Sequence, residues 1–261
     1  MNKRAAATRN QKTTPGHAPW MPSVGRPLGD WAALAGATPA PNRGRVSATC
    51  DVAGCERPTA VALGGFGFCR EHWPAARRWW LGDDHDADPG LDLHVLYGRR
   101  EARAYSNEQL AARGQRPVTE GGFLRLLYPA LYPDSFGLEP LRLGRRVGMA
   151  TAGDYALIVA FTRRMLDEVV ARRAAGDPEP VRPTPQECAA FLGAGEAAAF
   201  LTERRPASSP VTSDHLVYWR ATGRLPAVRV GPADVFLRSD IERLARLVGM
   251  GQGESDGNQT V

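Results

Sequence analysis

The chain has 261 residues, of which 43% are hydrophobic and 23% charged, so it can bury a sizeable core in two or three small domains. The 33 basic and 28 acidic residues give a net charge of +5, which mildly favours an anionic partner. No run approaches the ~20 apolar residues of a membrane span, and the basic N-terminus lacks the apolar core of a signal peptide. We therefore expect a cytoplasmic protein with no membrane partner.

Arginine supplies almost all of the basic charge, since Lys3 and Lys12 are the only lysines. Arginine suits the recognition of phosphates and guanine, but an arginine-rich, lysine-poor chain is also what a GC-rich genome encodes. Composition alone therefore does not decide between a nucleic-acid partner and a genomic bias.

Proline, glycine, alanine and basic residues dominate residues 1–45, with no sustained periodicity, which predicts a disordered basic arm. Within it, residues 28–36 (LGDWAALAG) fit a short helical turn. Residues 249–261 are polar and glycine-rich, which predicts a disordered tail. Polar linkers divide the rest into three predicted domains, at residues 46–82, 90–176 and 183–248.

The first of these domains holds three of the four cysteines, in CDVAGCERPTAVALGGFGFCREHW. We expect two short strands that turn at residues 64–65, then a helix that starts near Cys69. Cys69 and His72 would then lie on one helical face, with Cys50 and Cys55 opposite them. Three thiolates and an imidazole complete a closed tetrahedral zinc site, which is structural because no position stays open for catalysis. A disulfide, or buried free cysteines beside a surface histidine, are the alternatives.

This arrangement resembles the short Cys-x4-Cys…Cys-x2-His zinc fingers attached to many actinobacterial and phage proteins, some of which carry HNH nuclease domains. No His-Asn-His constellation follows, so the resemblance implies structural zinc and no nuclease chemistry. Cys188 stands apart, with Phe191 and Leu192 on a predicted helical face, and we expect it in the core.

Helices are expected throughout the middle domain. One starts at Ser106, where SNEQ fits a capping box, and a second runs from Thr119 until Pro129 interrupts it. The strongest pattern predicts a helix capped by Thr151 and ended by Gly176. Its apolar stripe consists of Tyr155, Ile158, Val159, Met165, Leu166, Val169 and Val170. The domain also holds three tyrosines that fit either aromatic packing or a nucleophile of a DNA-processing enzyme, namely Tyr105, Tyr128 and Tyr132.

The last domain begins with TPQE, a capping box that predicts a helix from Thr184. GEAAAFLTERR predicts a second helix. SDHLVYWRATG predicts a third after Thr212, with Leu216, Val217 and Trp219 facing the core. The segments LPAVRV and VFLR read as strands joined at GPAD, and a capping box formed by residues 239 and 242 starts the last helix.

Over residues 184–247 this domain resembles the winged helix-turn-helix domains of the MerR and excisionase class. HLVYWRATGRLPAVRV matches their recognition helix, Gly-Arg-Leu-Pro turn and wing, and LRSDIERL matches their closing helix. The helix that pairs with the recognition helix could start at Thr184 or Gly195. The GPAD tip lacks the arginines that relatives often carry. The predicted fold is thus mainly α with small β hairpins: a zinc finger, a helical middle domain and a C-terminal winged helix-turn-helix.

The recognition helix would present its N-terminal end to bases, while arginines meet flanking phosphates. The residues predicted to contact DNA are Ser213, Asp214, His215, Tyr218, Arg220, Arg224, Arg229 and Arg238. A small αβ domain whose arginines only solvate its surface is the plain alternative.

Three functions follow from these patterns. The first is a non-enzymatic, sequence-specific, nucleoid-associated protein that binds double-stranded DNA and carries structural zinc. It would be either a regulator or an excision or replication accessory factor of a mobile element. The second is a DNA-processing enzyme or enzyme subunit that the winged helix targets. The third is an adaptor that assembles with protein, either a second copy of the chain or a recombinase or replication protein.

Overall fold

In a computed structural model of the chain, the described residues are 26, 28–38, 47–82, 96–127, 137–144, 158–177, 179–204 and 210–250, with the side chains of 248–250 left out. They form a mixed α/β structure in which helices surround small antiparallel sheets. Among these residues, none of the helices has the length and apolar character needed to cross a lipid bilayer.

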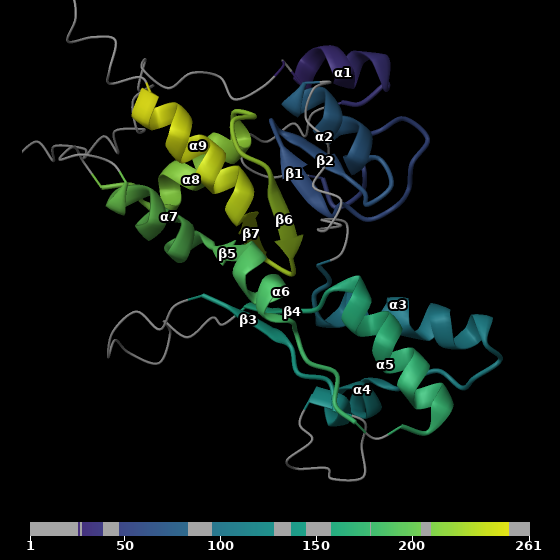
Figure 1. The fold of residues 1–261 in the computed structure, drawn as a ribbon. Coiled ribbons are helices and arrows are strands. Elements are labelled where there is room, and N and C mark those ends of the chain that lie inside the picture. The colour runs from purple at the N-terminus through teal and green to yellow at the C-terminus, as the bar shows by residue number, and fades with distance from the viewer. Residues whose placement is uncertain are drawn as a thin grey trace, which may run out of the picture.

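One five-stranded antiparallel sheet joins the cysteine-rich segment to the C-terminal segment (Figure 1). Its order is β2 (Phe66–Phe68), β1 (Val61–Leu63), β6 (Ala227–Val230), β7 (Ala233–Leu237) and β5 (Phe191–Gly193). The junction is the pairing of β1 with β6, in which Val61 lies opposite Val228. Strands from two segments that the sequence separates therefore share one backbone hydrogen-bond network.

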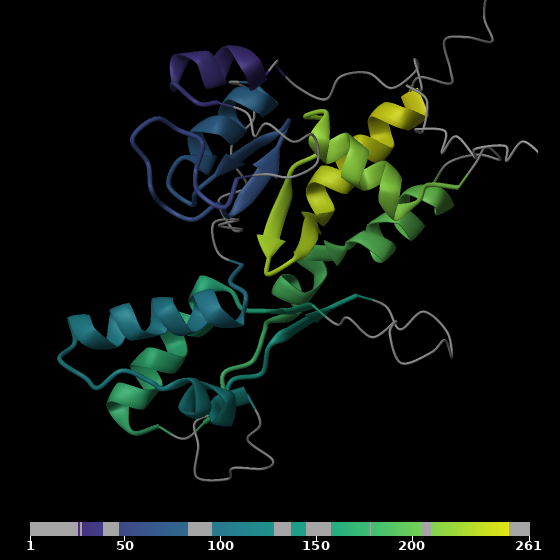
Figure 2. The same ribbon diagram turned by 180° about the vertical axis from the view of Figure 1, so that it is seen from behind.

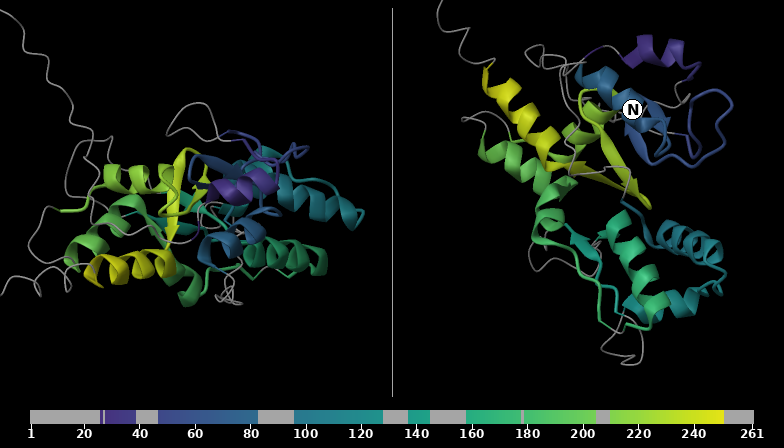
Figure 3. Two further views of the ribbon diagram at one scale, coloured as in Figure 1. Left: turned by 90° about the horizontal axis from the view of Figure 1, so that it is seen from above. Right: turned by 45° about the vertical axis from the view of Figure 1, so that its right-hand side comes forward.

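Helices from both segments pack around this sheet. From the N-terminal side come α1 (Leu28–Leu34) and α2 (Trp73–Leu81), which lie against each other. From the C-terminal side come α6 (Pro185–Ala190), α7 (Ala194–Glu203), α8 (Ser213–Ala221) and α9 (Arg238–Met250). Seen from above, α7, α8 and α9 lie on one side and α1 and α2 on the other (Figure 3). Trp73, Trp80 and Phe236 are among the largest fully buried side chains.

The middle segment forms a second lobe below the sheet (Figure 2). It comprises α3 (Arg99–Ala112), α4 (Glu120–Leu127), β3 (Leu141–Leu143), β4 (Ile158–Ala160) and α5 (Arg163–Ala175). Strands β3 and β4 pair antiparallel, and α3 packs on α5, where the Tyr105 hydroxyl donates a hydrogen bond of 2.6 Å to Asp167. Burial and this carboxylate raise the pKa of Tyr105 to about 12, which suits packing rather than nucleophilic attack.

The long helix predicted from Thr151 to Gly176 is wrong in its first half. Residues 151–157 lie outside the described part, Ile158 and Val159 belong to β4, and α5 starts only at Arg163. β-Branched neighbours favour an extended backbone, and the Thr162 hydroxyl accepts a 3.3 Å hydrogen bond from the Met165 N–H, which fixes the helix start there. Gly176, left-handed at φ 72°, ends α5 as predicted.

Two other predicted helix starts are wrong as well. The helix expected from Ser106 begins seven residues earlier, and Ser106 is buried in its interior. Gly98 is its N-cap, and the Glu101 carboxylate accepts the Gly98 N–H at 3.0 Å, a cap that no serine or threonine signals. The last helix begins at Arg238, directly after β7, so Ser239 lies inside it. The helix after Thr119 is confirmed as α4. A short helix within the predicted arm is confirmed too, as α1, which buries Leu28.

Candidate metal centre and nucleic-acid interface

Three cysteines and one histidine converge on one point beside β2. The Nδ1 atom of His72 lies 3.3 Å from the Cys50 sulfur and 3.5 Å from the Cys69 sulfur, and the sulfurs of Cys55 and Cys69 are 3.9 Å apart. All four ligand atoms lie within 4.8 Å of one another. A tetrahedral zinc ion, with bonds of about 2.3 Å to sulfur and 2.0 Å to nitrogen, spaces its ligand atoms roughly 3.5–3.8 Å apart. The four side chains therefore fit a metal ion, and His72 offers its Nδ1 atom.

Backbone hydrogen bonds hold the first two ligands in a tight loop. The Cys50 N–H donates to the Arg57 carbonyl at 2.8 Å, and the Cys55 N–H donates to the Val52 carbonyl at 3.0 Å. The Asp51 carboxylate accepts the Gly67 N–H of β2 at 2.6 Å, which ties the loop to the strand that leads to Cys69. The disulfide alternative is wrong, because all three cysteines are free.

The second pair of ligands precedes a helix instead of lying on one. The helix α2 begins at Trp73 with His72 as its N-cap, so the predicted start near Cys69 is wrong. The Trp73 N–H nevertheless donates to the Cys69 carbonyl at 3.0 Å, so the backbone already turns between the two ligands. Pro74, in the first turn, favours a helix start at this position because it needs no hydrogen-bond acceptor.

Three cysteines and one histidine are ligand types that a soft or borderline cation takes. Burial raises the pKa of the Cys50 thiol to about 11, so this thiol is neutral at pH 7 unless a cation stabilises its thiolate form. Cys50 and Cys69 are buried, whereas Cys55 and His72 are half-buried. An ion pair between Arg57 and Glu71 crosses the surface beside them. The arrangement is a closed four-ligand site, which suits a structural ion.

Helix α2 connects this centre to the C-terminal segment. The Trp80 indole N–H donates to the Gly223 carbonyl at 2.8 Å, directly after α8. Arg77 forms two hydrogen bonds with the buried Asp240 of α9, of 3.0 and 3.1 Å. The Gly64 N–H, at the turn between β1 and β2, donates to the Arg220 carbonyl at 2.9 Å. The metal centre and the C-terminal helices therefore form one packed unit.

The predicted recognition helix corresponds to α8. Its N-cap is Thr212, as expected, and the Nδ1 atom of His215 accepts the Thr212 N–H at 3.0 Å. This acceptor role places the ring proton of neutral His215 on Nε2. The His215 ring stacks on Trp219 with centroids 6.0 Å apart. Leu216 and Trp219 are buried as predicted, and α8 packs on α7, so α7, which starts at Ala194, is the helix that pairs with it.

One face of α8 is open to solvent near its N-terminus. Ser213 and Asp214 are exposed, and His215 and Tyr218 are half-buried. The prediction that Val217 faces the core is wrong, because 40% of its surface is exposed. Sequence periodicity could have placed it correctly, since Val217 lies three and four residues after Asp214 and Ser213 and so shares their face.

The predicted phosphate-contacting arginines differ in their surroundings. Arg220 is wrongly predicted, because it is only 6% exposed and forms an ion pair with Asp234, its neighbour on β7. Arg238 is half-buried, and its Nε donates a hydrogen bond of 2.7 Å to a backbone carbonyl of α6, so one guanidinium donor is already used within the protein. Arg224 and Arg229 are half-buried. Within the described part of the chain, the side chains of these last two form no hydrogen bond or ion pair, although the Nη1 atom of Arg224 is buried.

Cys188 is not a core residue, as the sequence suggested, but is exposed on α6. The apolar residues that follow it do not share its helix, because Phe191 and Leu192 form β5. Extending a helical period across this boundary produced the error.

Comparisons with known protein families, with curated proteins and with solved structures each give no match.

Proposed function

We propose that this chain is a sequence-specific binding protein for double-stranded DNA, with α8 in the major groove and a structural zinc ion at Cys50, Cys55, Cys69 and His72. The observation that carries the proposal is the open face of α8. Its side chains are exposed to solvent, while the opposite face of the helix packs on α7 and the sheet. A helix of this kind is held rigidly enough to present side chains to base edges.

The chemistry of that face suits base recognition. Ser213 offers a hydroxyl that can donate or accept, and Val217 offers methyl groups that can contact the methyl group of thymine. Asp214 could accept a hydrogen bond from the amino group of cytosine. In the cap geometry described above, His215 presents a donor at Nε2.

The surrounding elements support the same proposal. Helix α7 precedes α8 and packs on it, and the Thr202 hydroxyl of α7 accepts the Val211 N–H at 3.0 Å, which fixes the connection between them. After α8 the chain forms the β6–β7 hairpin, which would serve as the wing. This order agrees with the resemblance to the MerR and excisionase class. Because β1 pairs with β6, this wing would carry the zinc unit on its outer edge.

Zinc is the proposed metal because three thiolates and one imidazole in a tetrahedral arrangement are its usual structural ligands. Protein prepared without chelator should carry about one zinc ion per chain. Cys69→Ser should lose it, whereas Cys188→Ser, at the exposed cysteine of α6, should keep it. Full zinc content in the Cys69 variant would contradict the assignment.

The DNA proposal is tested by selecting bound sequences from a random duplex library and measuring affinity for the selected duplex. Ser213→Ala should weaken that complex by on the order of 1–3 kcal/mol and change the selected sequence. Ser239→Ala is the matched control, an exposed serine near the start of α9, and should leave both unchanged. Selection that yields no preferred sequence, with protein shown to be folded, would contradict the proposal.

A further inference from the structure

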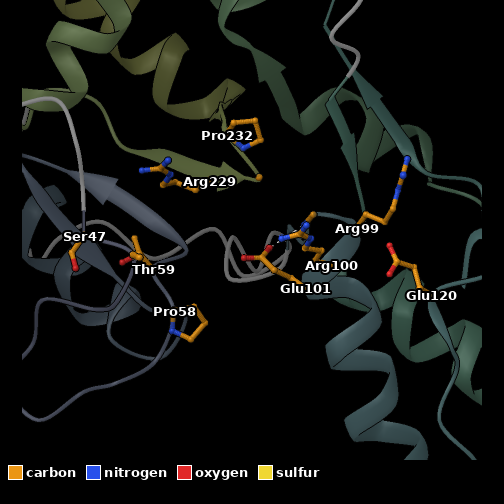
Figure 4. A pocket seen from close by; sticks show the side chains of 12 residues that line it. Ser47, Pro58, Thr59, Arg99, Arg100, Glu101, Glu120, Arg229 and Pro232 are labelled. Carbon is orange, nitrogen blue, oxygen red and sulfur yellow. Dashed lines mark hydrogen bonds between the residues drawn. The ribbon is translucent and has the colours of Figure 1, made fainter.

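Three segments that are far apart in sequence enclose an open cleft of about 750 Å³ (Figure 4). One side belongs to the loop of the metal centre, with Ser47, Pro58 and Thr59, and another to the hairpin, with Arg229 and residues 231–232. The third side is the start of α3 and α4, with Gly98, Arg99, Arg100, Glu101 and Glu120.

Two of these sides are fixed against each other by backbone contact. A Cβ atom added at Gly98 would lie 3.2 Å from the Gly231 nitrogen, so the start of α3 and the tip of the hairpin touch without side chains between them. The side formed by the metal-centre loop is tied to the hairpin because the Arg229 N–H donates to the Ala60 carbonyl at 2.7 Å. The cleft is therefore part of the packed structure.

The charges of the cleft are unbalanced in favour of arginine. Both lining carboxylates have arginine partners outside it: Glu101 lies 3.5 Å from Arg70, and Glu120 lies 3.6 Å from Arg103. Within the described part of the chain, Arg99 and Arg100 have no ion pair or hydrogen bond from their side chains, and both are exposed. Arg229 lies opposite Asp234 in the hairpin and its charge acts on that carboxylate, but the ion pair of Asp234 is with Arg220, so Arg229 itself forms no ion pair within the described part of the chain.

The position of two of these arginines is unfavourable for the helix that carries them. Arg99 and Arg100 occupy the first turn of α3, where the helix dipole disfavours positive charge. The first-turn cap is already provided by Glu101, which accepts the Gly98 N–H. Side chains that break a local rule in this way often serve a ligand, and guanidinium groups fit phosphate oxygens in particular.

We infer that this cleft binds the phosphodiester backbone of a nucleic acid through Arg99, Arg100 and Arg229. The inference rests on the proposed DNA-binding function and adds a contact from the middle segment to it. A phosphodiester chain fits better than a single nucleotide, because the described residues that line the cleft include no aromatic ring on which an isolated base could stack. No base is read here, so the contact adds affinity and not sequence preference.

The experiment compares Arg100→Gln/Arg229→Gln with Arg113→Gln/Arg116→Gln in the full chain. The control pair removes the same charge from exposed arginines at and beyond the far end of α3. Affinity is measured by fluorescence anisotropy for the selected duplex, a scrambled duplex, a single strand of the same composition and a mononucleotide, at several salt concentrations.

The cleft variant, Arg100→Gln/Arg229→Gln, should bind whichever nucleic acid occupies the cleft roughly tenfold more weakly at low salt. The slope of log affinity against log salt concentration should also fall by about two, because two phosphate contacts are lost. The control variant should match the unaltered protein in both. An equal loss for the selected and scrambled duplexes identifies duplex as the occupant, and a loss confined to the single strand identifies that form. Unchanged binding of every chain by the cleft variant, while the Ser213→Ala variant loses affinity for the selected duplex, would overturn the cleft and leave the α8 proposal standing. Loss of mononucleotide binding alone would overturn it in favour of a small ligand. Absence of all nucleic-acid binding in the unaltered protein would overturn both.

Discussion

Replacing Arg77 by methionine should destabilise the protein strongly, because Arg77 partners a buried carboxylate. The side chain of Asp240 is 4% exposed and that of Arg77 is 12% exposed, and two hydrogen bonds join them between α2 and α9. Removing one partner of such a pair costs about 3–5 kcal/mol. Arg243 also lies near Asp240 and lowers its pKa, so we expect the lower end of this range.

Urea unfolding followed by tryptophan fluorescence measures this cost, with Trp80 of α2 among the buried reporters. Arg78→Met is the control, since Arg78 is an exposed arginine on the same helix, and should change the free energy of unfolding by less than about 0.5 kcal/mol. Arg77→Met/Asp240→Leu should recover much of the lost stability, because no buried charge remains.

The deficit of the Arg77 variant should also depend on pH. Burial raises the pKa of Asp240 above its ordinary value, and removing Arg77 raises it further. The folded variant then binds a proton more tightly than the unfolded chain, so its deficit should shrink as the pH falls through the folded pKa of Asp240. A cost below about 1 kcal/mol at neutral pH would refute the view that α2 and α9 form one packed unit.

Three further predictions concern stability. The pKa of Glu187 is lowered from 4.5 to about 2 by its hydrogen-bond partners. The ionised side chain therefore contributes about 3 kcal/mol to the free energy of unfolding above pH ~4.5, and this contribution is lost as the pH falls toward 2. In unfolding experiments, Glu187→Gln should reduce the loss of stability over this pH range. Gly223→Ala should lower the free energy of unfolding in urea by more than Gly176→Ala does. Both glycines have a positive φ, of 79° and 72°, but the methyl added at Gly223 would lie 3.3 Å from Gly64, whereas the one at Gly176 meets open space. Equal losses would argue against the close approach of Gly223 and Gly64. Chelation of the metal should lower the melting temperature of the unaltered protein by several degrees but leave that of Cys69→Ser unchanged in circular dichroism.

The local features of the sequence predicted much of the C-terminal segment and of the metal centre. Several features depend on residues that lie close together in the sequence, and the sequence alone could therefore predict them. They are the caps at Thr184 and Thr212, the turn at residues 64–65 and the four candidate metal ligands. The caps and the turn are confirmed, and the four side chains lie together as a possible metal site, whereas the binding of a metal and its identity remain proposals.

Long-range pairing could not be predicted in the same way. Nothing local in residues 61–63 indicates that β1 would pair with β6, some 165 residues later, because both strands carry short apolar runs that could pair with many partners. The buried Arg220 shows the same limit, since its partner Asp234 is identified only once the hairpin lies beside α8. The switch from β4 to α5 was missed because Ile158 and Val159 fit a helical stripe as well as a strand.

The most direct test of whether α8 contacts bases pairs one substitution in the protein with substitutions at every base pair of the selected duplex. Each position is substituted in turn, and the affinity of each duplex is measured for the unaltered protein and for Val217→Ala. If Val217 contacts a base, the two affinity profiles should differ at one or two adjacent base pairs, by on the order of 1 kcal/mol, and coincide elsewhere after a constant offset. Profiles that coincide at every position, with both proteins folded, would contradict the placement of α8 in the major groove.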